Sequence, residues 1–304
     1  MQHISDTMID DLVSPTKAQQ VLLDAFRRFG SDQAAMQPRI RTESDGVKIS
    51  TLAAVIPAQG VAGAKIYTTI NGKFSFVILL FSTEDGRPLA SFDANAITRL
   101  RTAASSVIAA RYLARPDSSR LAIFGVGTQG REHIRQMVTA FPIDHISLCT
   151  PNPEPGLARR LSDRYRLDVE LCRAEQALEG ADIIVTATRS ATPLFSGEQL
   201  PGGCFIAAIG SSLPHARELD DAALRRASMV AVEWRTQSLQ EAGDLVLAAP
   251  GVLSASKIVE LGELVTGKVT VHRAPDDIMI YKSVGIGLED IALAGLAWQR
   301  FLAT

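Results

Sequence analysis

The residues most suggestive of chemistry are the glycines of Gly125-Val-Gly127-Thr-Gln-Gly130. The apolar run Leu121–Phe124 precedes them, and Arg131–Phe141 follows with apolar residues at helical spacing. A helix that begins at such a turn presents its N–H groups and the positive end of its dipole to an anion. Gly125 would form the turn, Gly127 would admit a phosphate, and Gly130 would let the helix approach the strand. The pattern predicts a dinucleotide pyrophosphate site; the alternative is an ordinary glycine turn.

The elements around this turn alternate between strand-like and helical or connecting segments from Arg120 onwards. Such alternation predicts an α/β domain with a Rossmann-type, doubly wound parallel sheet. The expected strands are Leu121–Phe124, His145–Cys149, Val169–Cys172, Asp182–Thr186, Cys204–Ile209, Met229–Glu233 and Ile278–Ser283.

The chain ahead of this domain has a different pattern. Apolar or alternating runs separated by glycines predict an antiparallel sheet, and Asn71-Gly72 between two of them is a strong hairpin signal. The expected strands are Val47–Thr51, Ala64–Thr69, Phe74–Phe81 and Pro88–Phe92.

Three helices are expected outside the parallel sheet. Ser14 would cap an amphipathic helix that includes Gln20–Phe29, and Asp93 would cap a long helix from Ala94 to about Ala114. A last amphipathic helix is expected over Gly287–Phe301. Because Arg115-Pro-Asp ends the long helix, we place the domains at residues 1–115 with 287–304, and 116–286.

Composition favours a globular protein that binds a small ligand. The 304 residues are 46% hydrophobic and 21% charged, with a formal net charge of −2, which argues against nucleic acid as a general partner. Phe74–Phe81, the longest apolar run, is too short for a membrane helix, and the polar N-terminus lacks a signal-peptide pattern, so a cytoplasmic location is expected. Cys149, Cys172 and Cys204 are expected to be reduced core residues, and no metal-ligand spacing is apparent.

Arg101-Thr-Ala-Ala104, followed after about twenty residues by the glycine turn, resembles the ornithine cyclodeaminase and mu-crystallin family. Further matching motifs are Gly63-Ala-Lys65, Ala181–Thr188, Arg217–Asp220 and Ser283–Asp290. The resemblance implies an α+β N-terminal domain for substrate binding and dimerisation, closed by the C-terminal helix, and a central NAD(P) domain. It also implies a homodimer acting at the α-carbon of amino or imino acids, as a cyclodeaminase, dehydrogenase or ketimine reductase. Some members of the family bind small ligands with little turnover.

The resemblance assigns three residues to the substrate. Arg101 matches the family's carboxylate-binding arginine, and a guanidinium suits that role because it can donate two parallel hydrogen bonds. Arg39 matches a second substrate arginine. Lys65 matches a lysine that contacts the carboxylate or polarises the imine; at the start of an apolar strand its ammonium would be partly desolvated. The alternatives are exposed arginines and a strand-edge lysine.

The glycine turn, the strand ends and the resemblance together assign residues to the cofactor. Gly125, Gly127, Thr128 and Gln129 are expected at the pyrophosphate, with Thr102 near it. The further cofactor residues are Thr186 and Thr188, where a strand ends at the ligand-binding edge, and Val284 and Gly285, in the segment that matches the one beside the nicotinamide. For each threonine, a hydrogen bond at a strand end is the alternative role.

The choice between NAD(H) and NADP(H) depends on the end of the second strand. NAD enzymes usually place a carboxylate there for the adenosine ribose. Here the sequence continues Cys149-Thr-Pro151-Asn, with no carboxylate before Glu154. This favours NADP(H), although the arginine that several NADP-using relatives carry is also missing, because Pro151 occupies its position.

The most informative departure from the family is Ser212 in Gly210-Ser-Ser212-Leu-Pro. Cyclodeaminases have an aspartate there as the acid/base, and serine does not ionise usefully at neutral pH. Residues 47–63 also lack the carboxylate that a cyclodeaminase offers to the substrate amine. Imine reduction requires less: the carboxylate must be held, the imine kept protonated and its carbon brought to the nicotinamide. His133 is expected on the surface, and His215 is a candidate for proton transfer in a loop.

The sequence therefore favours a homodimeric NAD(P)H-dependent reductase of a small ketimine carboxylate, with no metal. Lys65 and Arg101 would position and polarise the substrate, and Ser212 or a water would relay the proton. The alternatives are an ornithine cyclodeaminase and a mu-crystallin-like binder of small ligands.

Overall fold

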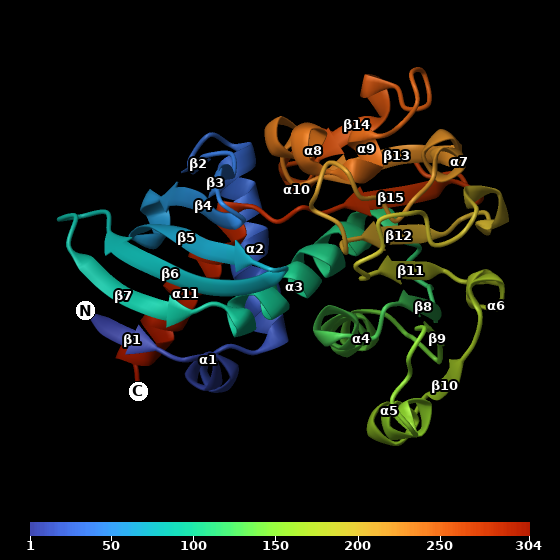
Figure 1. The fold of residues 1–304 in the computed structure, drawn as a ribbon, viewed down its shortest axis with the longest axis horizontal. Coiled ribbons are helices and arrows are strands. Elements are labelled where there is room, and N and C mark those ends of the chain that lie inside the picture. The colour runs from blue at the N-terminus through green and yellow to red at the C-terminus, as the bar shows by residue number, and fades with distance from the viewer. The chain divides into compact units, whose positions relative to one another are not determined.

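The computed structural model describes residues 1–304 and divides the chain into two compact units (Figure 1). The first unit comprises Met1–Ser105 and Gly285–Thr304, and the second comprises Ser106–Val284. The chain leaves the first unit inside helix α3 (Asn95–Leu113), ahead of the expected boundary at residue 115, and returns to it after Val284.

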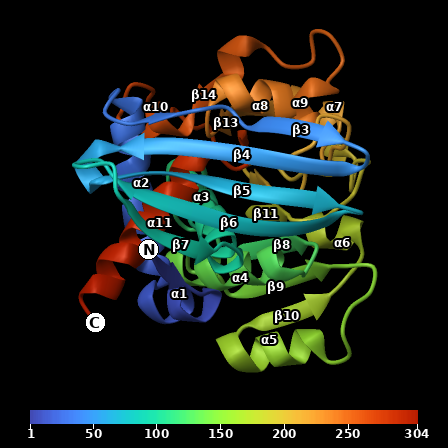
Figure 2. The same cartoon turned by 60° about the vertical axis from the view of Figure 1, so that its left-hand side comes forward.

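The first unit contains a seven-stranded sheet, whose long strands β4, β5 and β6 lie side by side in Figure 2. Its order is β1-β7-β6-β5-β4-β2, and β3 also pairs with β4. The sheet is antiparallel as predicted, except that β1 pairs in parallel with β7. The strands are β1 (Gln2–Ile4), β2 (Ala35–Met36), β3 (Ile40–Ser44), β4 (Val47–Ile56), β5 (Val61–Ile70), β6 (Lys73–Ser82) and β7 (Pro88–Asp93), and a short 3-10 turn (Pro57–Gln59) joins β4 to β5.

The predicted hairpin at Asn71-Gly72 is confirmed. Ile70 pairs with Lys73, which leaves a two-residue loop, and both loop residues have positive φ, +50° at Asn71 and +71° at Gly72. Asparagine and glycine tolerate this left-handed backbone, and its twist matches that of the flanking strands.

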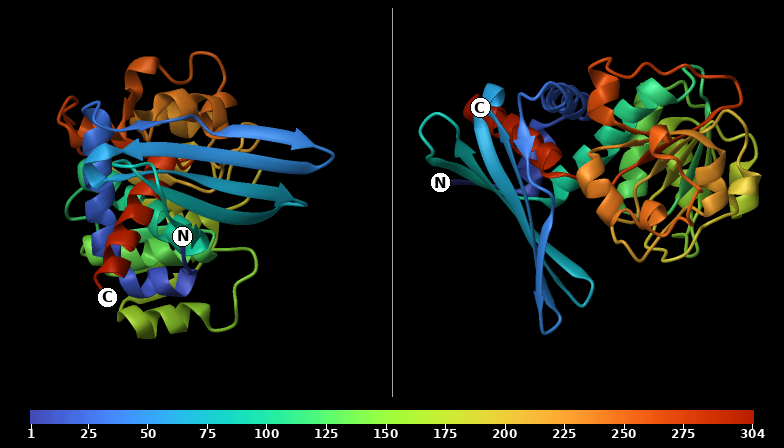
Figure 3. Two further views of the ribbon diagram at one scale, coloured as in Figure 1. Left: turned by 90° about the vertical axis from the view of Figure 1, so that its left-hand side faces the viewer. Right: turned by 90° about the horizontal axis from the view of Figure 1, so that it is seen from above.

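Three helices lie on one side of this sheet, where the last of them packs on the strands and the other two pack on that helix (Figure 3). They are α1 (Asp6–Leu12), α2 (Pro15–Gly30) and α11 (Gly287–Leu302). The predicted cap of α2 is confirmed, since the Ser14 hydroxyl accepts a hydrogen bond from the Lys17 N–H. α11 packs on α2, β4 and β5, so the alternate residues of β4 that face it, such as Leu52 and Ile56, are buried.

The expected cap of α3 is wrong. Asp6, rather than Asp93, accepts a hydrogen bond from the Ala96 N–H (2.7 Å) and another from the Asn95 side chain (2.9 Å). Asp93 instead accepts from the Asp6 N–H at the start of α1 (3.3 Å). A residue ninety positions away in sequence therefore supplies the cap, and no local pattern could reveal it.

The second unit contains an eight-stranded sheet of order β10-β9-β8-β11-β12-β15-β13-β14, parallel throughout, which confirms the predicted doubly wound fold. The strands are β8 (Arg120–Phe124), β9 (His145–Cys149), β10 (Asp168–Leu171), β11 (Ile183–Thr186), β12 (Phe205–Ala208), β13 (Ala227–Val232), β14 (Ile258–Glu260) and β15 (Ile278–Lys282). The connections contain α4 (Thr128–Ala140), α5 (Leu157–Tyr165), α6 (Ala174–Leu178), α7 (Asp221–Arg226), α8 (Arg235–Glu241), α9 (Gly243–Val246) and α10 (Leu261–Val265), with 3-10 turns at Gly197–Gln199 and Ala255–Lys257.

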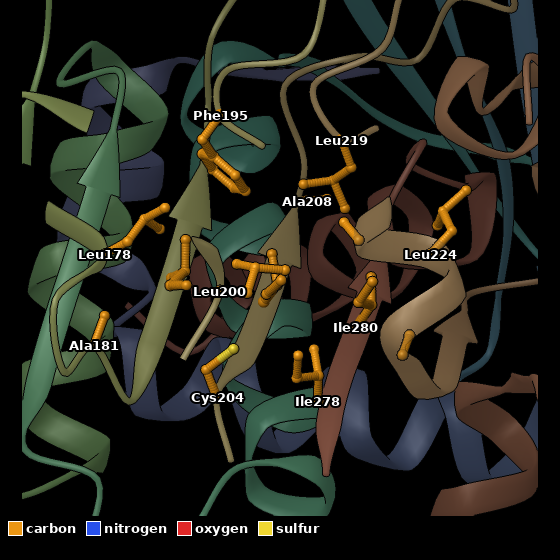
Figure 4. Packing of buried hydrophobic residues seen from close by; sticks show 14 of the residues in the cluster. Leu178, Ala181, Phe195, Leu200, Cys204, Ala208, Leu219, Leu224, Ile278 and Ile280 are labelled. Carbon is orange, nitrogen blue, oxygen red and sulfur yellow. The ribbon is translucent and has the colours of Figure 1, made fainter. Parts of the chain in front are cut away.

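Part of the core of this unit is shown in Figure 4. Ala208 of β12, Ile280 of β15 and Leu224 of α7 belong to one buried cluster. Phe195 extends the cluster from a connecting segment and packs against Phe124, with ring centroids 5.0 Å apart. All three cysteines are free, although only Cys204 is fully buried. None of the helices is long and apolar enough to cross a membrane.

The strand order reverses beside β8, because β9 and β10 lie on one side of it and β11 on the other. Ligands of doubly wound sheets bind outside the carboxyl ends of the strands at such a reversal. The Gly125 turn follows β8 and Thr188 follows β11, so both lie at this point of the sheet.

Candidate active site

Two groups of predicted residues come together, one in each unit. In the first unit, the guanidinium of Arg101 projects from α3 towards the first turn of α11. Its Nη1 donates to Glu289 Oε2 (2.9 Å), and its Nε lies 3.5 Å from Asp290 Oδ1. Ser105 adds a hydrogen bond to Glu289 (2.6 Å). Both carboxylates are almost completely buried, and their place in the first turn of a helix is electrostatically favourable.

Lys65 lies in the middle of β5 rather than at the start of a strand, because β5 begins at Val61, three residues earlier than expected. It is 2% exposed. Its Nζ donates to Thr98 Oγ1 (2.5 Å) and to Asp290 Oδ1 (3.1 Å). Burial lowers the pKa of Lys65 to about 8, although Asp290 opposes the shift. The Lys65 side chain is therefore mostly protonated at neutral pH, and it loses its proton slightly above neutral pH.

Gly285 connects the two predicted arginines. Its carbonyl oxygen accepts a hydrogen bond from Arg39 Nη2 (2.9 Å), and a Cβ at this position would lie 2.6 Å from Arg101 Nη2. Its φ of +75° is also disfavoured for other residues. The backbone therefore favours glycine here, and any larger residue would also displace the Arg101 guanidinium. The predicted Arg39, Arg101 and Gly285 form one cluster with Lys65.

The charges in this cluster nearly balance. Lys65 and the two arginines carry three positive charges, and Glu289 and Asp290 carry two negative charges. A protonated cluster therefore has one net positive charge in a poorly solvated place, which suits a single substrate carboxylate. We predicted no role for either carboxylate, although the Ser283–Asp290 motif contains both.

Thr102 follows Arg101 on α3 and is 6% exposed. Its hydroxyl donates to the Thr98 carbonyl one turn earlier (2.7 Å). The structure thus places Thr102 beside Thr98, which contacts Lys65, within the first unit.

In the second unit, the glycine turn has the geometry that a phosphate site requires. Gly125 has φ +90°, and its N–H donates to the Cys149 carbonyl (2.9 Å). A Cβ at Gly130 would lie 2.1 Å from the Gly125 oxygen, whereas a Cβ at Gly127 would meet nothing within 4 Å. Close packing thus requires glycine at 130, and open space lies in front of Gly127.

Gly127 is also the N-cap of α4, and no side chain caps this helix. α4 begins at Thr128, three residues earlier than expected, so Thr128 and Gln129 form its first turn. The turn therefore fits a pyrophosphate, because the positive end of a helix of thirteen residues lies beside the open space at Gly127.

The hydroxyls of Thr186 and Thr188 both donate to the buried carboxylate of Glu218, each at 2.7 Å. Glu218 also accepts from the N–H groups of Thr188 and Gly210, each at 2.8 Å. This is the strand-end hydrogen bonding considered above as the alternative role. Glu218 thereby joins the ends of β11 and β12, and the Arg217–Asp220 motif was its only signal in the sequence.

The segment with Ser212 is anchored by a buried lysine. Lys282, the last residue of β15, donates to the Ser211 carbonyl (2.8 Å) and lies 2.7 Å from Asp244 Oδ2. Asp244 in turn accepts from the N–H of Glu218 (2.8 Å). Ser212 itself is half-buried, and His215 beyond it is exposed. In the sequence, the only indication of this contact is that the otherwise apolar strand β15 ends with a lysine, Lys282.

Val284 is held by a second buried carboxylate. Its N–H donates to Glu233 Oε2 (3.0 Å), and the hydroxyl of Ser283 donates to Oε1 (2.5 Å). Glu233 directly follows β13, so it fixes the segment that follows β15 at the carboxyl edge of the sheet.

His133 is fully buried, so the expected surface position is wrong. Its ring nitrogens contact the Gln129 carbonyl (2.8 Å) and Ser106 Oγ (2.9 Å). Burial lowers the pKa of His133 to about 4, so the ring is neutral at physiological pH. His133 lies on the face of α4 that packs on α3, where it acts as a structural bridge.

Comparisons with known proteins agree with this geometry. A sequence profile of the ornithine cyclodeaminase/mu-crystallin family matches residues 1–304. Ketimine reductase mu-crystallin of Mus musculus is 32% identical over 284 residues, which are 90% of this chain and 87% of the mouse protein.

Several solved structures match over the whole chain. A probable ornithine cyclodeaminase from Bordetella pertussis is 56% identical, with a TM-score of 0.97 over 97% of that chain. The Delta(1)-pyrroline-2-carboxylate reductase of Thermococcus litoralis, solved with NADH and L-proline, is 26% identical, with a TM-score of 0.94 over 98% of that chain. The sequence motifs, the fold and these relatives agree, and the chain belongs to the ornithine cyclodeaminase/mu-crystallin family.

Proposed function

We propose that the chain is an NAD(P)H-dependent reductase of ketimine carboxylates of the pyrroline-2-carboxylate type. The first unit would hold the substrate and the second unit the cofactor. The observation that carries the proposal is the cluster of Arg39, Lys65 and Arg101 against two buried carboxylates, because its single net positive charge complements one substrate carboxylate. The mouse and Thermococcus litoralis relatives, which are named as reductases of this kind, support it.

In this proposal Arg101 donates two hydrogen bonds to the substrate carboxylate and Arg39 secures the Gly285 backbone beside it. Lys65 donates a proton or a hydrogen bond towards the imine nitrogen, and the Ser212 hydroxyl or a water relays the proton from solvent. A bound NADH or NADPH supplies the hydride. The C=N bond becomes CH–NH, so one hydride and one proton are consumed for each imine.

Two features favour reduction over cyclodeamination. Cyclodeamination must oxidise an amine, expel ammonia and reduce a cyclic imine, so it needs an ionisable group to shuttle protons. Ser212 cannot serve in that way at neutral pH. In addition, the residue directly opposite Lys65 on β4 is the buried Leu52. No residue of β4 carries a carboxylate that could bind the amine of the substrate.

Ornithine cyclodeaminase is the second candidate. The relative from Bordetella pertussis favours it, because that protein is 56% identical and is named a probable ornithine cyclodeaminase. In this case Glu289 or Asp290 would have to exchange protons with the substrate while each also binds a cation.

For the cofactor, we propose binding of NAD(P)(H) at the Gly125–Gly130 turn with a preference for NADP(H). β9 ends at Cys149 without a carboxylate that would repel a 2′-phosphate. Glu154, the first carboxylate after the strand, is paired with Arg131 (2.6 Å) and Arg160 (2.8 Å). These two arginines bring positive charge to this end of the sheet, which sequence order alone did not reveal.

We also propose a homodimer formed through the uncovered face of the first unit's sheet. Large apolar side chains on this face are exposed, among them Ile49 (43%), Val55 (43%), Val77 (36%) and Phe81 (36%). They alternate with the residues that α11 covers, so they belong to the opposite face. Extended apolar surfaces of this kind usually mark protein interfaces.

The proposed function is tested by following NADH and NADPH absorbance with a panel of cyclic imine carboxylates, while ammonia release from L-ornithine is assayed in parallel. A reductase oxidises the cofactor in proportion to the imine and releases no ammonia. Ammonia release at constant absorbance would instead establish the cyclodeaminase. A shift in melting temperature with cofactor or imine, but without either reaction, would identify a ligand-binding protein.

A further inference from the structure

Three aromatic side chains pack together on the same sheet face as Lys65. Tyr67 of β5 pairs directly with Phe76 of β6, and their ring centroids lie 5.2 Å apart. Phe74 stacks on Phe76, with centroids 5.7 Å apart and ring planes within 9°. Phe74 is 51% exposed and the other two rings are half-buried. This group, Tyr67, Phe74 and Phe76, is called the aromatic group below.

The aromatic group adjoins the charged cluster. Lys65 Nζ lies 4.8 Å from the centroid of the Phe76 ring. A carboxylate or imine bound to this ammonium at about 2.8 Å would therefore have Phe76 as a neighbour. A substituent two or three bonds from the carboxylate carbon would reach the ring. The aromatic group thus lies where the side chain of a bound α-imino acid can extend.

A nearby polar group supports a binding role. Ser50 lies opposite Tyr67 on β4 and is 1% exposed, yet its hydroxyl has no hydrogen-bond partner. An unsatisfied buried hydroxyl costs about 1–3 kcal/mol and is uncommon in a closed core. Its place beside partly exposed aromatic rings is typical of a ligand pocket, which combines apolar walls with a few polar groups.

We infer that the aromatic group is the subsite for the substrate side chain and selects α-imino acids with an uncharged, planar ring over those with a methyl group or a second carboxylate. The inference rests on the proposed reductase function and specifies its substrate class. Flat rings gain from offset or edge-to-face packing on Tyr67 and Phe76. A second carboxylate would have to be accommodated among these rings, at the cost of its hydration.

Arg41 lies opposite Ser50 on β3, and its positive charge would favour a substrate with a second carboxylate. Lys48, two residues from Ser50 on β4, forms an ion pair with Glu43 (2.8 Å). If Arg41 governed this region, dicarboxylic imines would be preferred. The test below therefore includes one.

The experiment measures kcat/KM with saturating NAD(P)H for three N-methyl imines, formed from methylamine with phenylpyruvate, pyruvate or 2-oxoglutarate. The wild type should prefer the phenylpyruvate imine over the pyruvate imine by about tenfold, which corresponds to one well-packed aromatic contact. Phe76→Ala and Tyr67→Ala should each bring this ratio close to one. Phe76→Leu keeps most of the side-chain volume, so it should fold normally and lower this ratio only in part.

Phe301→Ala is the matched control, because Phe301 also belongs to an aromatic pair of the first unit, with Trp298 (6.0 Å). It should leave the ratio unchanged. A merely structural role of Phe76 would lower activity with all three imines equally. An unchanged ratio in the Phe76 and Tyr67 variants, or a wild-type preference for the pyruvate or 2-oxoglutarate imine, would overturn the inference while the reductase function stands. Failure of the wild type to reduce any imine would instead contradict the proposed function, and the inference with it.

Discussion

Asp290 contacts two of the three cations of the charged cluster, Lys65 and Arg101, and this gives it a measurable role. Lys65 has its pKa near 8 because burial lowers it, while Asp290 raises it and Arg101 and Arg39 lower it. Asp290→Asn removes the one group that favours the charged lysine. The pKa of Lys65 should then fall, and the alkaline limb of a kcat/KM profile against pH should move to lower pH.

Glu289→Gln is the control for this variant. Glu289 neighbours Asp290 and binds Arg101 and Ser105, whereas Lys65 donates its hydrogen bond to Asp290. We expect it to raise KM for the imine and leave the alkaline limb in place. If Asp290→Asn also left the limb unmoved, Lys65 would not be the group that titrates in catalysis.

His133 links helix α4 to α3 through its hydrogen bond with Ser106. The ring is neutral in the folded protein, with a pKa near 4, and titrates near 6.5 when unfolded. Between these values the unfolded chain binds the additional proton, so stability falls as the pH falls through this window. Lowering the pH from 7 to 5 should cost about 2 kcal/mol through this group.

Urea unfolding at the two pH values checks this expectation. In His133→Gln the pH-dependent loss should be smaller by that amount, because the titrating ring is gone. Equal losses in the wild type and the variant would show that His133 titrates normally in the folded protein.

Two glycines of the turn between β8 and α4 should have different roles, one in packing and the other in cofactor binding. Gly130→Ala should lower the melting temperature, since the added Cβ meets the Gly125 oxygen at 2.1 Å. Gly127→Ala has open space and φ −78°, so it should fold nearly normally but weaken cofactor binding by about tenfold. Melting temperature and Kd for NADPH distinguish the two; an unchanged Kd in Gly127→Ala would place the pyrophosphate elsewhere.

Much of this element-level architecture followed from the sequence, because the strand, turn and helix around Gly125 and the Asn71-Gly72 hairpin are local patterns. Features that depend on distant residues did not. Asp6 caps α3 although it lies ninety positions away in sequence, and β1 is too short to show periodicity. His133 looked exposed because its burial depends on α3, which precedes α4 by many residues.

The candidate site divides in the same way. Arg101, Lys65 and Arg39 were found by motif. Their carboxylate partners were not assigned, because α11 joins them only after the chain has passed through the whole second unit. The hydrogen bonds from Thr186 and Thr188 to Glu218 were not predicted either, because they join segments that are about thirty residues apart in sequence.

At the scale of the molecule, the uncovered sheet face should determine the oligomeric state. Light scattering after size-exclusion chromatography should give twice the chain mass for the wild type. Ile49→Lys should shift it towards the monomer, because a charge in an apolar interface loses its hydration. Leu171→Lys, at a similarly exposed apolar residue of the second unit (42%), should remain dimeric. A dimeric Ile49→Lys would place the interface elsewhere.

The central claim assigns the substrate to the first unit and the cofactor to the second. Arg101→Ala tests it most directly, with kcat/KM for a cyclic imine carboxylate and Kd for NADPH measured on the same preparation. We predict that kcat/KM falls at least a hundredfold, because the substrate carboxylate loses a charge-assisted bidentate contact, while Kd changes less than twofold. Wild-type imine reduction in this variant, or loss of NADPH binding together with activity, would contradict the account.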